Sequence, residues 1–117
     1  MNRWVLLKHT IGDLNNHDFH FDFLVEHGND CLTWKMFKLP KKNGESVEIF
    51  DQMNHRLFWL SQNEKKLSRN RGFVKRIDYG FYISSGGKLD TENFSLHLDG
   101  QLLLGFLKKS GNLCKLI

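Results

Sequence analysis

One alternating stretch decides the fold: Asp18-Phe19-His20-Phe21-Asp22-Phe23-Leu24-Val25-Glu26. Successive side chains of an extended chain point to opposite faces, so the three phenylalanines and Val25 share one face. His20 and Asp22 share the other face with the remaining residues of the stretch. This period of two predicts a β-strand whose aromatic face lies in the core.

The same alternation recurs along the chain and is broken by turn signals such as Asn43-Gly44 and Asp99-Gly100. We expect further strands over the following ranges: 3–9, 31–39, 46–50, 55–60, 73–83, 94–98 and 102–106, with a last short strand near the C-terminus. The polar segment 61–71 is expected to form a long loop or a short helix. About eight short strands predict an all-β fold, which is a sandwich or, as we favour, a small antiparallel β-barrel.

Length and composition fit one domain over residues 1–117, because 40% hydrophobic residues in a chain of this size fill a single core. No apolar run approaches about 18 residues, so no membrane span is expected. The start of the chain lacks the pattern of a signal peptide, and we expect a cytoplasmic protein. Cys31 and Cys114 lack metal-ligand spacing and are expected to be free thiols in or near the core. The net charge of +4 favours a polyanionic partner such as nucleic acid.

His20 and Asp22 leave the same face of one strand, which makes them a suitable pair of metal ligands. His9 ends the preceding strand and is the natural third ligand, because sequential strands usually lie side by side. Two imidazoles and one carboxylate suit Mn²⁺, Zn²⁺ and Fe²⁺ equally well. The alternative is that all three are solvated polar residues on the wet face of a sheet.

A series of motifs runs in order over nearly the whole chain. These are Lys8-His9, His20-Phe21-Asp22-Phe23-Leu24-Val25-Glu26, Leu32-Thr33-Trp34, Asn54-His55-Arg56-Leu57-Phe58-Trp59, Ile77-Asp78-Tyr79-Gly80-Phe81-Tyr82, and a closing hairpin with Phe94, Leu96, Gly100, Leu102, Gly105 and Phe106. In type and order they resemble the 3′-phosphoesterase domain that is fused to, or encoded beside, bacterial DNA ligase D.

The resemblance implies a small β-barrel enzyme that uses Mn²⁺, or another divalent transition metal, to remove 3′-phosphates and 3′-terminal ribonucleosides from DNA. It gives the metal-ligand roles to His9, His20 and Asp22. It gives contact with the scissile phosphate to His55, and we expect the adjacent Arg56 to take part in catalysis. The expected partners are DNA or RNA–DNA 3′ ends and a DNA ligase or other repair proteins, with the chain acting as a monomer.

The chain departs from the family pattern at three places. The spacer between His9 and His20 is longer, with an insertion around His17. Leu24 stands where the family has an arginine, a residue that grips phosphate through two parallel hydrogen bonds. Trp59 stands where the family has a tyrosine and lacks the hydroxyl group. Cations that could replace the missing arginine are Lys8, Lys35, Arg56, Arg69 and Arg71.

These departures leave two rival functions open. One is a non-catalytic module of the same fold that binds DNA or protein through its basic loops. The other is a small-molecule site that uses the same histidines for Fe²⁺ chemistry. Trp4, Trp34 and Trp59 each alternate with their neighbours, so we expect them to pack in the core rather than to stack on bases.

Overall fold

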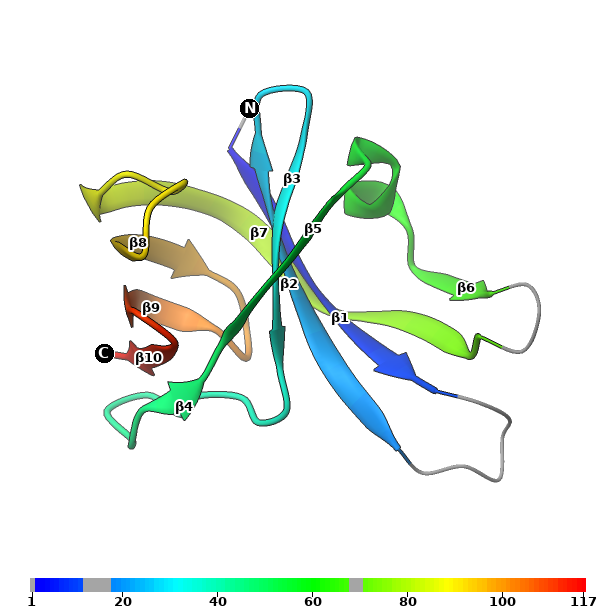
Figure 1. Ribbon diagram of the computed structural model, residues 1–117, viewed down its shortest axis with the longest axis horizontal. Coiled ribbons are helices and arrows are strands. Elements are labelled where there is room, and N and C mark those ends of the chain that lie inside the picture. The colour runs from blue at the N-terminus through cyan, green and yellow to red at the C-terminus, as the bar shows by residue number, and fades with distance from the viewer. Residues whose placement is uncertain (1, 12–17, 68–70) are drawn as a thin grey trace.

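The computed structural model describes residues 2–11, 18–67 and 71–117. These residues form ten strands and one short 3-10 helix (Figure 1). In chain order the elements are β1 (Arg3–Thr10), β2 (Phe19–His27), β3 (Asp30–Met36), β4 (Val47–Glu48), β5 (Phe50–His55), η1 (Leu57–Ser61), β6 (Glu64–Lys66), β7 (Phe73–Gly87), β8 (Asn93–Asp99), β9 (Leu104–Ser110) and β10 (Leu113–Leu116). The predicted all-β fold is confirmed, with ten strands rather than about eight.

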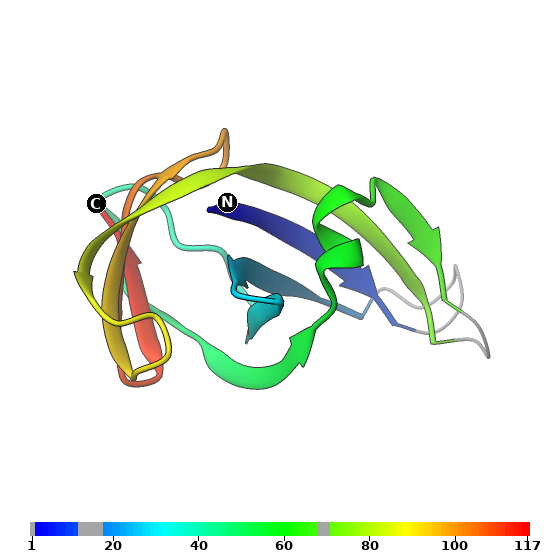
Figure 2. The same ribbon diagram turned by 90° about the horizontal axis from the view of Figure 1, so that it is seen from above.

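The strands form one antiparallel sheet in the order β4-β10-β9-β8-β7-β1-β2-β3-β5, and β6 pairs with β7 beside this path. The long strand β7 joins two halves of the sheet. Its residues 73–81 pair with β1, and its residues 82–87 pair with β8. Figure 2 shows β7 arching from one half to the other, so that the sheet curls around its core.

The two end strands of the sheet, β4 and β5, are consecutive in the chain and are separated by the buried Ile49. The backbone therefore crosses from one end of the sheet to the other at this residue. Among the described strands, β4 pairs with β10 and β5 pairs with β3, and the two ends do not pair with each other. The sheet is thus not closed, and closure of the predicted barrel remains a prediction. We call the open boundary between β5 and the β8–β10 half the seam.

Two apolar clusters lie on opposite faces of the β1–β2–β3 half. The first fills the inside of the curl and takes residues from both halves of the sheet, among them Trp4, Phe23, Trp34, Leu96 and Leu107. Phe23 and Val25 on the aromatic face of β2 are therefore in the core, as predicted, whereas Phe21 is partly buried and Phe19 is 41% exposed. The second cluster lies on the other face, next to η1, and consists of Val5, Leu7, Leu24, Cys31, Leu60 and Val74.

The region around η1 differs from the sequence prediction. The strand expected over 55–60 is wrong, because Leu57–Ser61 forms a 3-10 helix and β5 occupies residues 50–55. The apolar run from Leu57 to Leu60 is continuous rather than alternating. A helix of three residues per turn places Leu57 and Leu60 on the same side, where both pack against the second cluster.

A buried carboxylate in β7 holds the β8–β9 connection. Asp78 accepts hydrogen bonds from the backbone amides of Tyr79, Gln101, Leu102 and Leu103 at 2.8–3.0 Å. These bonds keep residues 101–103 out of the sheet, so β9 begins at residue 104 instead of residue 102 as predicted.

Two further expectations bear on the class of protein. Cys31 and Cys114 are free and buried, as predicted. Within the described ranges, the structure contains no helix with the length and apolar character needed to cross a membrane.

Candidate metal centre

The pairing of β1 with β2 positions three potential ligands on one face of the sheet. His9 lies directly opposite His20, and Leu7 lies directly opposite Asp22. Residues opposite each other in an antiparallel pair project from the same face, so His9, His20 and Asp22 share the face of the second cluster. The prediction that strand one supplies the neighbour of His20 is confirmed.

The three side chains converge. His20 Nε2 lies 3.1 Å from Asp22 Oδ1, and His9 Nδ1 lies 3.9 Å from Asp22 Oδ2. The two imidazole rings meet edge to face with their centroids 4.8 Å apart. One ligand atom from each residue lies within 4.8 Å of the others, and this is the one such group of three or more metal-ligand residues within residues 2–11, 18–67 and 71–117.

The cluster lies at the border of the second apolar cluster rather than on an open surface. His20 is 6% exposed and Asp22 is 7% exposed, whereas His9 is half-buried. Leu7 lies two residues before His9 on β1, and Leu24 lies two residues after Asp22 on β2. Both leucines belong to the second cluster. The alternative of three solvated side chains on a wet face therefore does not describe His20 and Asp22.

A backbone carbonyl fixes the tautomer of His9. Its Nε2 lies 2.9 Å from the carbonyl oxygen of Arg71. A carbonyl only accepts hydrogen bonds, so Nε2 carries the proton and donates it. When the ring is neutral, its lone pair is then on Nδ1, the nitrogen that faces Asp22. Such an outer hydrogen bond is what orients metal-binding histidines in general.

Burial keeps His20 in its neutral form. Desolvation lowers the pKa of His20 below its ordinary value of 6.5, although the nearby Asp22 carboxylate acts in the opposite direction. The charge of Lys35, and that of His9 when it is protonated, lower the pKa of His20 further. A neutral imidazole is the form that binds a metal.

The donor set fits a divalent transition metal. Two imidazole nitrogens and a carboxylate oxygen are borderline donors that suit Mn²⁺, Zn²⁺ or Fe²⁺ and leave coordination positions open. Metal–ligand bonds of about 2.0–2.2 Å place two ligands of one ion at most about 4.4 Å apart. The widest separation of 4.8 Å therefore has to shorten for all three residues to bind one ion.

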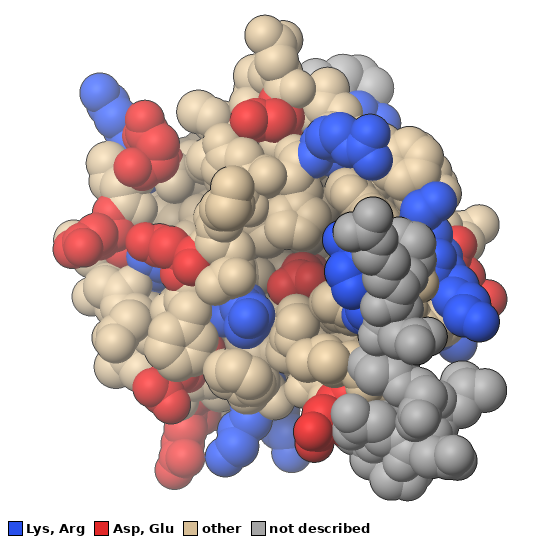
Figure 3. Space-filling model, turned by 45° about the vertical axis from the view of Figure 1, so that its right-hand side comes forward, with Lys and Arg blue, Asp and Glu red and all other residues tan. Residues whose placement is uncertain are grey.

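The pairing register of β2 with β3 places one cation, Lys35, beside the cluster. It lies directly opposite Asp22 in the β2–β3 pair and therefore projects from the same face. The charge of Lys35 acts on His20, which supports its place beside the cluster. On the face drawn in Figure 3, Lys and Arg side chains are more frequent at the right and Asp and Glu side chains at the left.

The structure does not bring His55 and Arg56 to the cluster. His55 lies opposite Cys31, four residues along β3 from Lys35, which is about 13 Å at the rise of a strand. Its Nδ1 lies 3.1 Å from the carbonyl oxygen of Met53. Arg56 precedes η1, with its guanidinium 5.2 Å from the ring centre of Phe58.

Leu24 and Trp59, the two residues that depart from the pattern of the 3′-phosphoesterase domain, both have packing roles. Leu24 is fully buried in the second cluster, and Trp59 packs against that cluster from η1. Trp4 and Trp34 are buried in the first cluster, as predicted. The ammonium group of Lys8 lies 4.2 Å from the ring centre of Phe19. His17 and Arg69 lie outside the described residues.

Sequence reasoning missed the role of the Arg71 carbonyl. The contact between His9 and Arg71 spans 62 positions, and a backbone oxygen leaves no trace in residue type. No family model matches the chain, and no match to a curated protein is found.

Proposed function

We propose that this chain is a metal-dependent phosphoesterase that acts on the 3′ ends of DNA or RNA–DNA strands. The observation that carries the proposal is the convergence of His9, His20 and Asp22 on one face of the sheet, at the border of the second cluster and beside Lys35. The motif order that resembles the 3′-phosphoesterase domain supports the choice of substrate. The proposal includes the expected barrel as a sheet curled on itself with the seam left unpaired, supported by the succession of β4 and β5 at opposite ends of the sheet.

Each residue of the centre has a defined task in this proposal. His9, His20 and Asp22 hold a divalent ion, Mn²⁺ by resemblance, which when bound polarises the phosphate and lowers the pKa of water. Lys35 attracts the terminal phosphate and balances its negative charge. Water attacks the phosphorus atom, the bond from phosphorus to the 3′ oxygen breaks, and that oxygen takes a proton. The products are a 3′-hydroxyl end and inorganic phosphate.

His55, at the end of β5, lies opposite the start of β3, and Arg56 follows it in the chain. Both residues take a different part in the proposal. At that distance from the cluster they contact the nucleic-acid chain away from the scissile phosphate. We therefore expect substitutions at these positions to weaken substrate binding more than the chemical step. The wider setting proposed is a monomer in the cytoplasm that works on ends later joined by a ligase or handled by other repair proteins.

The test uses a 3′-phosphorylated primer–template, Mn²⁺ and the purified protein, with phosphate release as the readout. His20→Ala is expected to abolish release, because the ion loses a ligand from the rigid strand. His27→Ala, an exposed histidine of the same strand, is the matched control and is expected to keep full activity. Absence of release from the unmodified protein at high enzyme concentration would contradict the proposal.

One observation favours the second candidate, a binding module without catalysis. Leu24 is buried and Trp59 packs in a cluster, so neither position supplies a donor to phosphate. Such a module would bind DNA with a steep dependence on salt and would be insensitive to His20→Ala. The enzyme would show the opposite pattern, since His20→Ala would remove activity and leave DNA binding.

A further inference from the structure

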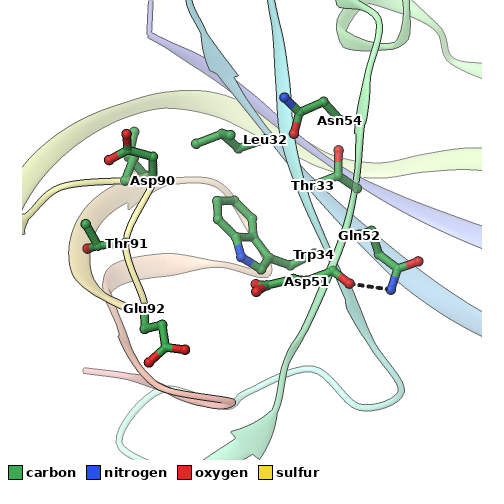
Figure 4. A pocket seen from close by; sticks show the side chains of 10 residues that line it. Leu32, Thr33, Trp34, Asp51, Gln52, Asn54, Asp90, Thr91 and Glu92 are labelled. Carbon is green, nitrogen blue, oxygen red and sulfur yellow. Dashed lines mark hydrogen bonds between the residues drawn. The ribbon is translucent and has the colours of Figure 1, made fainter.

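A cleft of about 300 Å³ lies along the seam, between β5 and the segment 88–92 that precedes β8. Figure 4 shows Asp51 on one wall and Asp90, Thr91 and Glu92 on the other, with the indole of Trp34 between them. A second hollow of about 400 Å³ also touches Asp51 and Glu92 and continues along the seam. We call the first of these the seam cleft. Its size is at the lower end of ligand-binding pockets.

The seam cleft lies on the opposite face of the sheet from the metal centre. Trp34 belongs to the first cluster, whereas Lys35 projects from the face that carries Asp22. Side chains alternate along β3, so the sheet itself separates the two places. A ligand in the seam cleft is therefore a different molecule, or a different part of one, from a phosphate at the metal centre.

The charge of the seam cleft has one sign. Its charged lining residues are Asp51, Asp90 and Glu92, and of the described residues that line it none is a lysine or an arginine. Lys109 lines the second hollow, where its ammonium group donates to the carbonyl of Glu92 at 3.0 Å. A cleft lined by carboxylates concentrates cations and repels phosphates.

The indole N–H of the buried Trp34 lines the cleft and indicates a ligand that carries a hydrogen-bond acceptor as well as a positive charge. Trp34 is 5% exposed and lies between the rings of Phe23 and Phe94, at centroid distances of 5.9 and 5.2 Å. Its Nε1 has no hydrogen-bond partner in the described part of the chain. No fully buried side-chain nitrogen or oxygen of the described residues lacks a partner, so Nε1 is not fully buried. This N–H therefore reaches solvent through the cleft that Trp34 lines. An indole N–H can only donate, so a matching ligand carries an acceptor.

The strand that forms one wall has an unpaired edge. β5 pairs with β3 on one side, and none of the described strands pairs with its other side. The carbonyl of Asp51 accepts from Gln52 Nε2 at 2.7 Å, and the carbonyl of Met53 lies 3.1 Å from His55 Nδ1. These bonds come from the neighbouring exposed or half-buried side chains of Gln52 and His55. An edge with such groups is a template for an added strand.

We propose that the seam cleft binds an extended basic peptide segment of a partner protein. Lysine or arginine side chains of the peptide pair with Asp51, Asp90 and Glu92. A backbone carbonyl of the peptide accepts the hydrogen bond from Trp34 Nε1. The peptide backbone runs along the free edge of β5, past the two hollows that share Asp51 and Glu92.

Two other ligand classes fit less well. A nucleic-acid strand brings phosphates to three carboxylates, which is unfavourable. A small polyamine satisfies the carboxylates but offers no acceptor to Trp34 Nε1 and does not use the edge of β5. An extended peptide supplies the cations, the acceptor and the backbone together.

The test is a titration of the protein with the peptide acetyl-Thr-Lys-Val-Arg-Thr-amide, followed by calorimetry and by the indole N–H resonance of Trp34 in NMR spectra. The control peptide carries glutamine in place of lysine and arginine. We expect the basic peptide to bind, to shift the Trp34 resonance, and to bind more weakly as salt rises. The resonance is assigned by its loss in Trp34→Phe, in which the affinity is expected to fall about fivefold.

Variants of exposed carboxylates make the test independent of folding. Asp51→Asn combined with Glu92→Gln is expected to weaken binding about tenfold, from the loss of two ion pairs. Glu45→Gln combined with Glu64→Gln removes two exposed charges outside the cleft and is expected to change binding less than about twofold. Equal weakening by both double variants, equal binding of the glutamine peptide, or equal binding of spermidine at the same resonance would overturn the proposal.

Discussion

His9 donates a hydrogen bond from Nε2 to the backbone carbonyl of Arg71, at 2.9 Å. This bond makes Nδ1 the free nitrogen of the ring and turns it toward Asp22. The residue after Arg71 is Gly72, whose φ of +102° is reserved in practice for glycine. A Cβ at Gly72 would collide with the carbonyl oxygen of Thr10. The orientation of a candidate metal ligand therefore depends on a glycine that lies outside the ligand set itself.

The first prediction concerns Gly72→Ala. The added methyl group displaces the backbone at Arg71 and removes the hydrogen bond to His9, so Mn²⁺ affinity is expected to fall about 10- to 100-fold. Calorimetric titration with Mn²⁺ measures the change. Gly111→Ala is the matched control, because Gly111 also has a positive φ, +60°, but has open space around a Cβ. Equal loss of affinity in both variants would show that backbone strain alone is responsible.

The second prediction separates phosphate binding from metal binding. Lys35→Met removes the cation opposite Asp22 and is expected to slow phosphate release about 100-fold, the usual effect of losing one transition-state partner. Mn²⁺ affinity is not expected to fall, because a like charge has been removed from beside the ion. Lys38→Met, an exposed lysine that follows β3, is expected to leave both quantities unchanged. A parallel loss of metal affinity and activity would contradict this role for Lys35.

The third prediction is the pH dependence of stability that Glu26 contributes. Hydrogen bonds from Arg3 lower the pKa of Glu26 from 4.5 to about 2. Because the folded-state pKa is lowered, the stabilisation is complete above about pH 4.5 and is lost as the pH falls toward 2. Since the Arg3 side chain is 39% exposed, we expect about 1–2 kcal/mol rather than the full value of the shift.

Urea unfolding of the unmodified protein and of Glu26→Gln at pH 7, 4.5 and 2.5 measures this contribution. The difference in unfolding free energy between the two proteins is expected to shrink between pH 4.5 and pH 2.5. Glu64→Gln, in the exposed strand β6, serves as the control and should show a small, constant difference. A difference for Glu26→Gln that stays the same at all three pH values would refute the linkage.

The fourth prediction concerns the buried carboxylate of Asp78. Asp78→Asn replaces one accepting oxygen by a donor that faces backbone N–H groups, including those of Leu102 and Leu103. We expect a loss of about 2–4 kcal/mol of unfolding free energy, because hydrogen bonds to a charged acceptor are lost and buried donors lack partners. Thermal or urea unfolding measures it, with the exposed Asp90→Asn as a control expected to stay within about 0.5 kcal/mol. Equal stability of the two variants would show that the connection between β8 and β9 does not need this carboxylate.

Much of the candidate metal centre was predictable, because the order of its residues along neighbouring strands is local. The period of two in β2 places His20 and Asp22 on one face, and neighbouring strands bring His9 opposite His20. What the alternation did not predict is that this face is also buried. Leu24 is the one apolar residue on it within 18–26, yet it anchors a second cluster contributed by distant segments such as η1.

The parts that were not predictable depend on tertiary contacts. The helix η1 replaces a strand because Leu57 and Leu60 have an apolar surface to cover, and that surface exists only after β1, β2 and β7 have paired. The start of β9 is delayed by Asp78, which is more than twenty positions earlier. His55 has the right type for catalysis, but the pairing of β5 with β3 places it far from the ligands.

The central position of β7 has a kinetic consequence. β1 to β3 follow one another as hairpins, as do β7 to β10, and such local units form quickly. The pairing of β1 with β7 joins chain segments more than sixty positions apart, so its loop-closure entropy makes it a slow step. His20 and Asp22 belong to the first unit and Arg71 adjoins the second. If the proposed centre binds an ion, a refolding chain should gain tight binding only when these two units dock, and metal uptake would then report the last stage of folding.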